Sequence, residues 1–124
     1  MAVSKIEVNS TSTTLEQGLA KAWTHFQGTG TAASVDGYNI SSVDDDGTGN
    51  FGIHFTNDMG NATYAVTFGA DDDGGSSVVI GSDTTNGTMA AGNFDFESYY
   101  VNSTSNRTDY DYSNIYIVIH GDLA

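Results

Sequence analysis

Hydrophobic residues occupy every second position along most of this sequence, and that rhythm limits its possible folds more than any other feature. The clearest runs are residues 22–27, 51–56, 64–68, 94–101 and 115–120, with shorter candidates at 38–40 and 78–80. A period of two is typical of a β-strand that buries one face. We therefore predict an all-β protein built from short strands.

The segments between these runs are rich in Gly, Asn, Asp, Ser and Thr, and the chain has 15 glycines and no proline. Glycine accepts the positive φ angles of tight turns, and Asn and Asp hydrogen-bond their own backbone there. Short strands joined by such turns are typical of an antiparallel sandwich or a small barrel. Of these we predict an antiparallel, jelly-roll-like β-sandwich over residues 20–124, as one domain.

The core of this sandwich should be thin. Hydrophobic residues make up 38% of the 124 positions, although 14 aromatic residues (7 Tyr, 6 Phe and 1 Trp) argue that the chain folds. A domain of this size buries only a modest core. Chains of this kind commonly gain stability by associating with copies of themselves.

The first 19 residues differ from the rest and are predicted to form an arm. Residues 13–16 fit a helix-capping box, and Leu15 and Leu19 lie four apart, as on one helix face. Gly18 opposes a helix here, at a cost of roughly 1 kcal/mol relative to Ala. A short N-terminal helix is therefore the most structure that we expect before the first strand.

The charge of the chain excludes some functions. Three basic residues stand against sixteen carboxylates, which gives a net charge of −13. This charge repels phosphate backbones, so we do not expect nucleic-acid binding. The sequence contains no apolar run of the ~20 residues that a membrane span needs, so we expect no membrane insertion. It also lacks cysteine and an apolar leader, so we expect neither disulfides nor the usual export route.

Two acidic runs are the weak candidates for a metal site. Asp44 and Asp46 belong to the first run, and Asp71 and Asp73 belong to the second. Adjacent carboxylates in a loop can collect Ca²⁺, but the ligand spacing, the glycine position and the helical flanks of a helix-loop-helix calcium site are absent from the sequence. We favour plain hairpin-turn chemistry for both runs and expect no cofactor.

Catalytic arrangements also find little support. His25, His54 and His120 lie in predicted strands and are far apart in sequence, unlike the usual zinc-ligand spacing. Asp95 and Glu97 share one strand face, where a pair of carboxylates is more often solvated than catalytic. The sequence shows neither a serine elbow nor a phosphate loop. We therefore expect a protein that is not an enzyme.

One loop, residues 106–112, combines aromatic and charged side chains. Its candidate binding residues are Arg107, Asp109, Tyr110, Asp111 and Tyr112. Tyrosine faces stack on apolar patches while carboxylates bind hydroxyls, so such loops recognise sugars or proteins. The alternative is that the tyrosine pair only covers the end of the sandwich. Both interpretations are open at this point.

The central segment, residues 21–68, carries an ordered series of short motifs. In chain order they are Lys21-Ala22-Trp23 with Phe26, Gly28-Thr29-Gly30-Thr31, Tyr38-Asn39-Ile40-Ser41-Ser42-Val43, Asp46-Gly47-Thr48-Gly49, Phe55-Thr56, Met59 and Asn61-Ala62-Thr63-Tyr64-Ala65-Val66. The series resembles a β module of tail fibres and other virion structural proteins of tailed bacteriophages, especially marine ones. It covers somewhat under half of the chain, and residues 69–124 show no motif that we can match.

The resemblance implies a non-enzymatic, homotrimeric virion component, made in the host cytoplasm and exposed on the particle. As a tail-fibre-like module it would contact a host surface glycan or protein. Ile6, Val8, Leu15 and Leu19 of the arm would then attach it to a tail adaptor or to the capsid shell. Family members often carry this module after a long shaft, whereas residues 1–20 alone precede it here. A capsid decoration protein is therefore an alternative, and a free carbohydrate-binding module is a second one.

Overall fold

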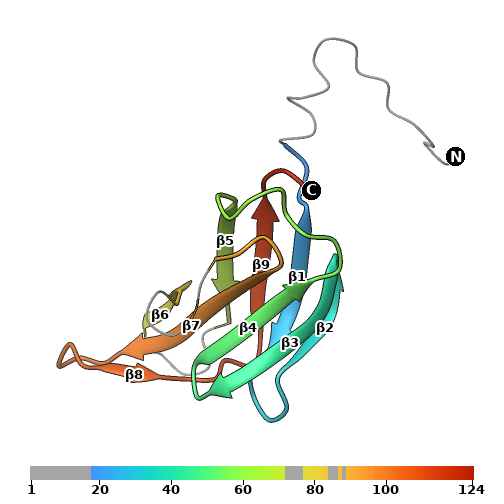
Figure 1. Ribbon diagram of the computed structural model, residues 1–124. Helices are drawn as coiled ribbons and strands as arrows, with labels where there is room; N and C mark the ends of the chain where they lie inside the picture. The colour runs from blue at the N-terminus through green and yellow to red at the C-terminus, as the bar shows by residue number, and fades with distance from the viewer. Residues whose placement is uncertain (1–17, 72–76, 84–86, 88) are drawn as a thin grey trace, which may run out of the picture.

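The computed structural model describes residues 18–71, 77–83, 87 and 89–124, which form two antiparallel β-sheets (Figure 1). The strands are β1 (Ala22–Gln27), β2 (Ala33–Tyr38), β3 (Ile40–Gly47), β4 (Asn50–Phe55), β5 (Ala65–Ala70), β6 (Ser77–Ser82), β7 (Asn93–Val101), β8 (Arg107–Asp109) and β9 (Ile115–His120). Sheet A has the order β2-β1-β9-β5. Sheet B has the order β3-β4-β7-β6, and β8 also pairs with β7. The predicted all-β sandwich is confirmed.

The strand order differs from the jelly roll that we expected. In a jelly roll nearly every connection between strands crosses from one sheet to the other, whereas four of the eight connections between the described strands do so here. Here β1 and β2 form a hairpin within sheet A, and β3 and β4 form a hairpin within sheet B. The first and last strands, β1 and β9, are neighbours at the centre of sheet A. The arrangement is therefore a two-sheet sandwich with its own strand order.

The five clearest alternating runs correspond to β1, β4, β5, β7 and β9, and the short run at 78–80 lies within β6. The short run at 38–40 was wrong as a single strand, because the chain turns at Asn39 between β2 and β3. β2, most of β3 and β8 were not predicted as strands. The first acidic run lies within β3 rather than in a turn, and the hairpin itself turns at Thr48 and Gly49.

The N-terminal predictions fall largely outside the described residues. Ile6, Val8 and Leu15 lie there, together with the proposed helix. Leu19 is described and is 54% exposed. The described residues contain no helix that is long and apolar enough to span a bilayer.

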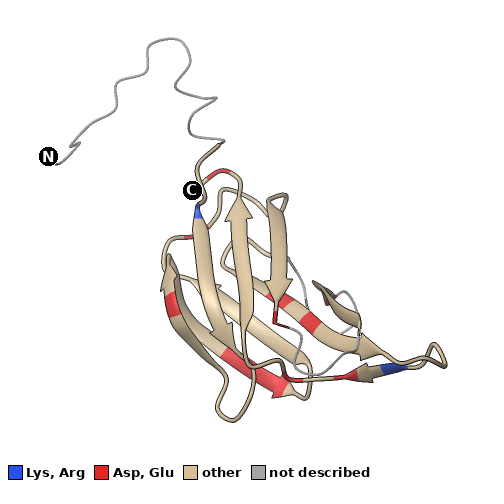
Figure 2. Ribbon diagram, turned by 180° about the vertical axis from the view of Figure 1, so that it is seen from behind, with Lys and Arg blue, Asp and Glu red and all other residues tan. Residues whose placement is uncertain are grey.

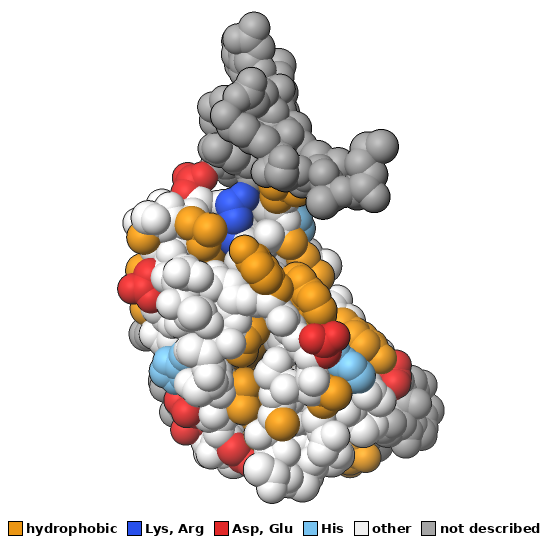
Figure 3. Space-filling model, turned by 90° about the vertical axis from the view of Figure 1, so that its right-hand side faces the viewer, with side chains coloured by type: hydrophobic (Ala, Val, Ile, Leu, Met, Phe, Trp, Pro, Cys, Tyr) orange, Lys and Arg blue, Asp and Glu red, His pale blue; other side chains and the backbone are white. Residues whose placement is uncertain are grey.

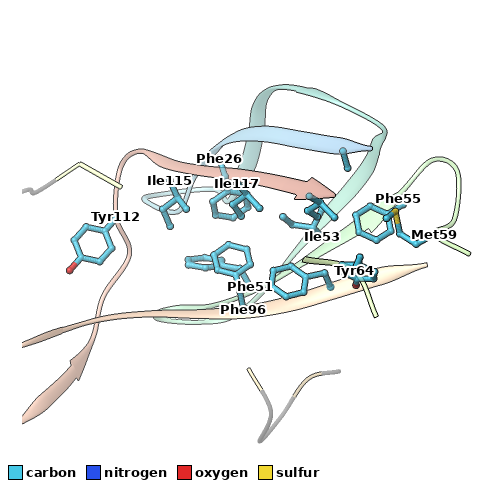
Figure 4. Packing of buried hydrophobic residues seen from close by; sticks show 13 residues of the cluster. Phe26, Phe51, Ile53, Phe55, Met59, Tyr64, Phe96, Tyr112, Ile115 and Ile117 are labelled. Carbon is cyan, nitrogen blue, oxygen red and sulfur yellow. The ribbon is translucent and has the colours of Figure 1, made fainter. Parts of the chain in front are cut away.

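The core lies between the inner faces of the two sheets. Its buried hydrophobic residues are Ala22, Phe26, Phe51, Ile53, Phe55, Met59, Tyr64, Phe94, Phe96, Tyr112, Ile115, Ile117 and Ile119. Figure 4 shows them as one layer, with Tyr112 at one end and Met59 and Tyr64 at the other. Phe26 of sheet A meets Phe51 and Phe96 of sheet B edge-on, at ring-centroid distances of 5.0 and 5.3 Å. Burial of each such ring contributes roughly 1.5–3 kcal/mol.

Tyr64 anchors the end of the core near the C-terminus. Its buried hydroxyl donates towards the carbonyl oxygens of Ala90 and Asn93, at 3.1 and 2.9 Å. Burial, reinforced by the nearby charge of Asp95, raises the pKa of Tyr64 to about 12. The hydroxyl therefore stays protonated and keeps donating well above neutral pH.

Asn39 forms the corner at which the chain passes from sheet A to sheet B. Its φ of 60° lies in the left-handed region, which Asn tolerates better than most residues. Its side-chain amide donates to the carbonyl oxygens of Lys21 and Asn57, at 3.1 and 3.0 Å. Its side-chain oxygen accepts from the Asn57 backbone N–H at 2.7 Å. Asn39 therefore joins the edge strands β2 and β3 to the residue before β1 and to the segment after β4.

We predict that Asn39→Ala lowers the free energy of unfolding by about 3 kcal/mol, because it removes these hydrogen bonds and disfavours the positive φ. Asn39→Gly should cost less, since glycine adopts this φ without strain. Urea denaturation followed by Trp23 fluorescence measures both. Asn50→Ala is the matched control, because its side chain makes one exposed contact, to the carbonyl oxygen of Thr48. Equal losses for Asn39→Ala and Asn50→Ala would contradict the role of Asn39 as the corner.

Candidate functional site

The hairpin of β7 and β8 projects from the sandwich (Figure 1). It carries Arg107 and Asp109, and the other three predicted binding residues follow β8 directly. The first part of β7 pairs with β4, and its last three residues pair with β8, so β8 continues the line of β4. The loop at the tip is organised by Asn102. Its side-chain oxygen accepts from the backbone N–H groups of Thr104 and Asn106, at 3.0 and 3.1 Å. The tip is therefore a hydrogen-bonded loop.

Arg107 fastens β8 to β7. Its two terminal nitrogens donate to the two carboxylate oxygens of Glu97 at 3.1 and 2.9 Å, and its Nε donates to Asp109 at 2.8 Å. Its guanidinium carbon lies 4.2 Å from the centre of the Tyr99 ring, a cation–π contact. The hydrogen bonds to Glu97 and Asp109 hold the pKa of Arg107 above its already high usual value. The charge of Arg107 is therefore paired with carboxylates of the same chain.

The tip of the β3–β4 hairpin packs against the same region through Gly49. Its φ is +71°, and a Cβ at this position would lie 2.9 Å from the Tyr110 nitrogen, so a larger residue does not fit. The Gly49 N–H donates to Asp111 at 2.7 Å, and its carbonyl oxygen accepts from the Ser98 N–H at 2.7 Å. Asp111 is therefore used to hold the turn.

Three tyrosines lead from the surface of the hairpin into the core. Tyr100 and Tyr110 meet edge-on at 5.7 Å between centroids, and Tyr110 meets Tyr112 edge-on at 4.9 Å. Tyr110 is 36% exposed, whereas Tyr112 is 3% exposed and donates to the Tyr99 carbonyl oxygen at 3.3 Å. Tyr112 therefore packs in the core and offers no surface to a ligand.

The structure brings the predicted binding residues together, but most of them also have structural tasks. Arg107 and Asp109 pair with each other, Asp111 holds Gly49, and Tyr112 is buried. Tyr110 and the outer side of Asp109 remain accessible. The sequence could not separate these roles, because adjacent tyrosines in an irregular segment show no alternation that marks the buried one.

The outer face of sheet B is acidic. Asp44 and Asp95 flank Gly52 on the strands either side of it, and an oxygen of Asp44 lies within hydrogen-bond distance, 2.6 Å, of His54 Nε2. A hollow of about 360 Å³ beside them is lined by Asp46, Asn50, Phe51, Asp83, Gly87 and Asp95. The strands of sheet B, with β8, carry six carboxylates, three of them consecutive in β3.

The metal candidates do not converge in the described part of the chain, where no group of three or more His, Asp or Glu side chains is arranged to hold an ion. Asp44 pairs with His54, and Asp46 lines the acidic hollow. Asp71 accepts from the Asn114 side chain at 2.9 Å. Asp73 lies outside the described residues.

The outer face of sheet A is aromatic and almost uncharged, and the sequence did not reveal it as a surface of interest. Trp23, Tyr38 and Tyr116 are 38%, 55% and 43% exposed there. Of the four strands, only β2 carries a carboxylate, Asp36, as Figure 2 shows from behind. Figure 3, which views the β2–β3 side, shows hydrophobic side chains gathered over the sheet A side. Aromatic residues alternating with core positions were the signal that could have indicated this face.

Comparisons with known proteins returned no matching family model, no curated relative and no solved structure. The resemblance of residues 21–68 to tail-fibre-like modules therefore stays a prediction. The candidate sites are defined by geometry alone: the β7–β8 hairpin and the outer faces of the two sheets.

We predict that Tyr112→Ala lowers the free energy of unfolding by about 3–5 kcal/mol, because it leaves a cavity at the end of the core. Tyr110→Ala should cost about 1 kcal/mol or less, since this ring is partly exposed and loses only edge contacts. Chemical denaturation of the two single variants measures the difference. Equal losses would contradict the division between a packing tyrosine and an accessible one.

Proposed function

We propose that this chain is a non-enzymatic structural protein of a tailed-phage particle, a tail-fibre-like module that contacts the host surface. The unequal character of its two outer faces carries this proposal. The outer face of sheet A exposes three aromatic rings and one carboxylate at its edge, while sheet B carries most of the charge of the strands. A subunit that is covered on one side and solvated on the other is expected to show this division.

The β7–β8 hairpin supports the host-contact part of the proposal. It projects from the sandwich, and the ion pair of Arg107 with Glu97 links its two strands. A rigid projection loses little conformational entropy on binding. Tyr110 and Asp109 offer an aromatic ring and a carboxylate of the kind that bind glycans or proteins. This region would meet the receptor.

Attachment to the particle is assigned to residues 1–19. Ile6, Val8, Leu15 and Leu19 would supply apolar contacts to a tail adaptor or to the capsid shell, and Leu19 is exposed where the described chain begins. Self-association also belongs to the proposal, because an exposed aromatic face in water favours burial against another surface. The homotrimer expected from the sequence is one form of it.

Two alternatives rest on particular observations. The acidic outer face of sheet B suits a capsid decoration protein, which would turn this charge towards solvent. The exposed rings of Trp23, Tyr38 and Tyr116 suit a carbohydrate-binding module, which would stack sugars on them.

Immunogold labelling of the chain on purified particles tests the proposed function directly. We expect gold at the tail. Gold over the capsid would support the decoration protein instead. Particles without label, in a lysate that contains the free chain, would overturn both particle roles. Sugar affinity of the free chain would then support the binding module.

For the host contact, we predict that particles carrying Tyr110→Ala adsorb to host cells roughly fivefold less or worse, as expected when an aromatic anchor is lost. Counting free particles after a fixed adsorption time measures this loss. Tyr110→Phe is the matched control, because it keeps the ring and its stacking. Equal amounts of each variant in the particles must be verified by blotting. Unchanged adsorption of Tyr110→Ala would remove Tyr110 from the receptor contact.

A further inference from the structure

We infer that the outer face of sheet A binds the same face of a second copy of this chain, in a twofold pair with aligned strands. This inference rests on the proposed assembly role, because it names what covers the aromatic face. It replaces the expected trimer with a pair, and it follows from the register of the four strands.

Two rows of side chains cross the outer face of sheet A. The first row runs from β2 to β5 through Tyr38, Trp23, Val118 and Thr67. The second row runs through Asp36, His25, Tyr116 and Gly69. In both rows the residue on β5 is small, and Ala65 on the same strand is small as well. These three residues form a low surface over β5, which we call the shelf. Large rings therefore stand over β2, β1 and β9, beside the shelf.

A twofold axis makes this face complementary to itself. We place the axis between the two faces, parallel to the strands and midway between β1 and β9. Each row then faces the same row of the second copy in reversed order, so that β2 lies over β5 and β1 lies over β9. Tyr38 then faces Thr67 of the second copy, and Trp23 faces Val118. In the second row, Asp36 faces Gly69 and His25 faces Tyr116. Tyr38, the most exposed of the three rings, thus meets the small residues of β5. Sheets packed in this way normally lie about 10 Å apart with nearly aligned strands.

The same arrangement keeps like charges apart. β2 of one copy lies over β5 of the other, so the two Asp36 residues are three strand spacings apart, about 14 Å across the sheet. This exceeds the screening length of about 8 Å at physiological salt. The contact therefore brings no two carboxylates of the sheet A strands within screening distance.

The charge of the chain also selects a second copy as the occupant. Two molecules that each carry a net charge of −13 can meet closely only where carboxylates are sparse. Contact through the outer face of sheet B would bring Asp44, Asp95 and Glu97 of both copies together. The outer face of sheet A carries one carboxylate, offset to its edge. A cationic partner would bind the acidic outer face of sheet B in preference. The outer face of sheet A is therefore the better contact surface for a second copy of the chain.

Trp23 is the one tryptophan in the sequence and lies on the inferred interface, so its fluorescence reports pairing. We expect the purified full chain to sediment with twice the mass of a single chain at micromolar concentration. Dilution should shift the Trp23 emission to longer wavelength as the pair separates. Three times the mass, or a single mass with constant emission at every concentration, would overturn the inference. Particle labelling judges the proposed function separately.

Substitutions test the register itself. Thr67→Glu should raise the dissociation constant of the pair at least about tenfold, because it places a charge against the Tyr38 ring. Adding Tyr38→Lys to the same chain should restore most of the association, since the introduced ammonium group then faces the introduced carboxylate of the second copy. Ser42→Glu is the matched control, because it adds the same charge to an exposed position of β3. Failure of the double variant to recover would overturn this register.

A sugar on the same face is the competing occupant. Titrating the chain with neutral oligosaccharides while following Trp23 emission tests it. We expect no change beyond that caused by dilution. A saturable change that accompanies loss of the double mass would show that a glycan, and not a second copy, covers the face.

Discussion

The turn at Asn39 is the constraint on which the rest of the sandwich depends. It moves the chain from sheet A to sheet B within one residue, and its side chain ties that corner to Lys21, just before β1, and to Asn57, two residues after β4. The two sheets are thereby fixed to each other on the β2–β3 side. On the opposite side, β5 and β6 have few contacts, and Phe68, Ala70, Val78 and Ile80 are only partly buried. The core is therefore closed on one side and thin on the other, as the low hydrophobic content implied.

With the sheets fixed, strand alternation decides what each outer face displays. The residues between the buried positions of β1 and β9 are aromatic, β-branched or histidine, whereas those of β7 include Asp95 and Glu97. The charge is therefore unevenly distributed between the two outer faces. The outward positions of β1 and β9 hold uncharged residues or histidine, whereas those of β7 include carboxylates. This segregation costs little in the single chain, since Arg107 offsets part of the acidic face and water solvates the remainder.

The sequence predicted the strands that bury one face against the core and missed β2, β8 and most of β3, for one physical reason. Alternation arises only where one face of a strand is buried, as in Phe51, Ile53 and Phe55 of β4. β2, β3 and β8 lie at edges or outside the sandwich and are exposed along most of their length, so their residues show no such rhythm. The residues of the loop 106–112 lie close together, and their role in binding stays a prediction. The division of this loop into Tyr110 at the surface and Tyr112 in the core depends on how the loop meets Gly49, which strand periodicity does not encode.

The edge strands that escaped prediction also explain why association through an edge is disfavoured. An exposed edge invites another strand to pair with it unless charge or a bulge prevents this. β3 presents Asp44, Asp45 and Asp46 along its edge, and two irregularities interrupt its register with β4. β2 carries a bulge opposite His25 and Phe26. Both edges on the closed side of the sandwich are thus blocked. Copies of this chain that meet on that side have no free ladder to extend, and the almost uncharged outer face of sheet A is better suited to burial than these two edges.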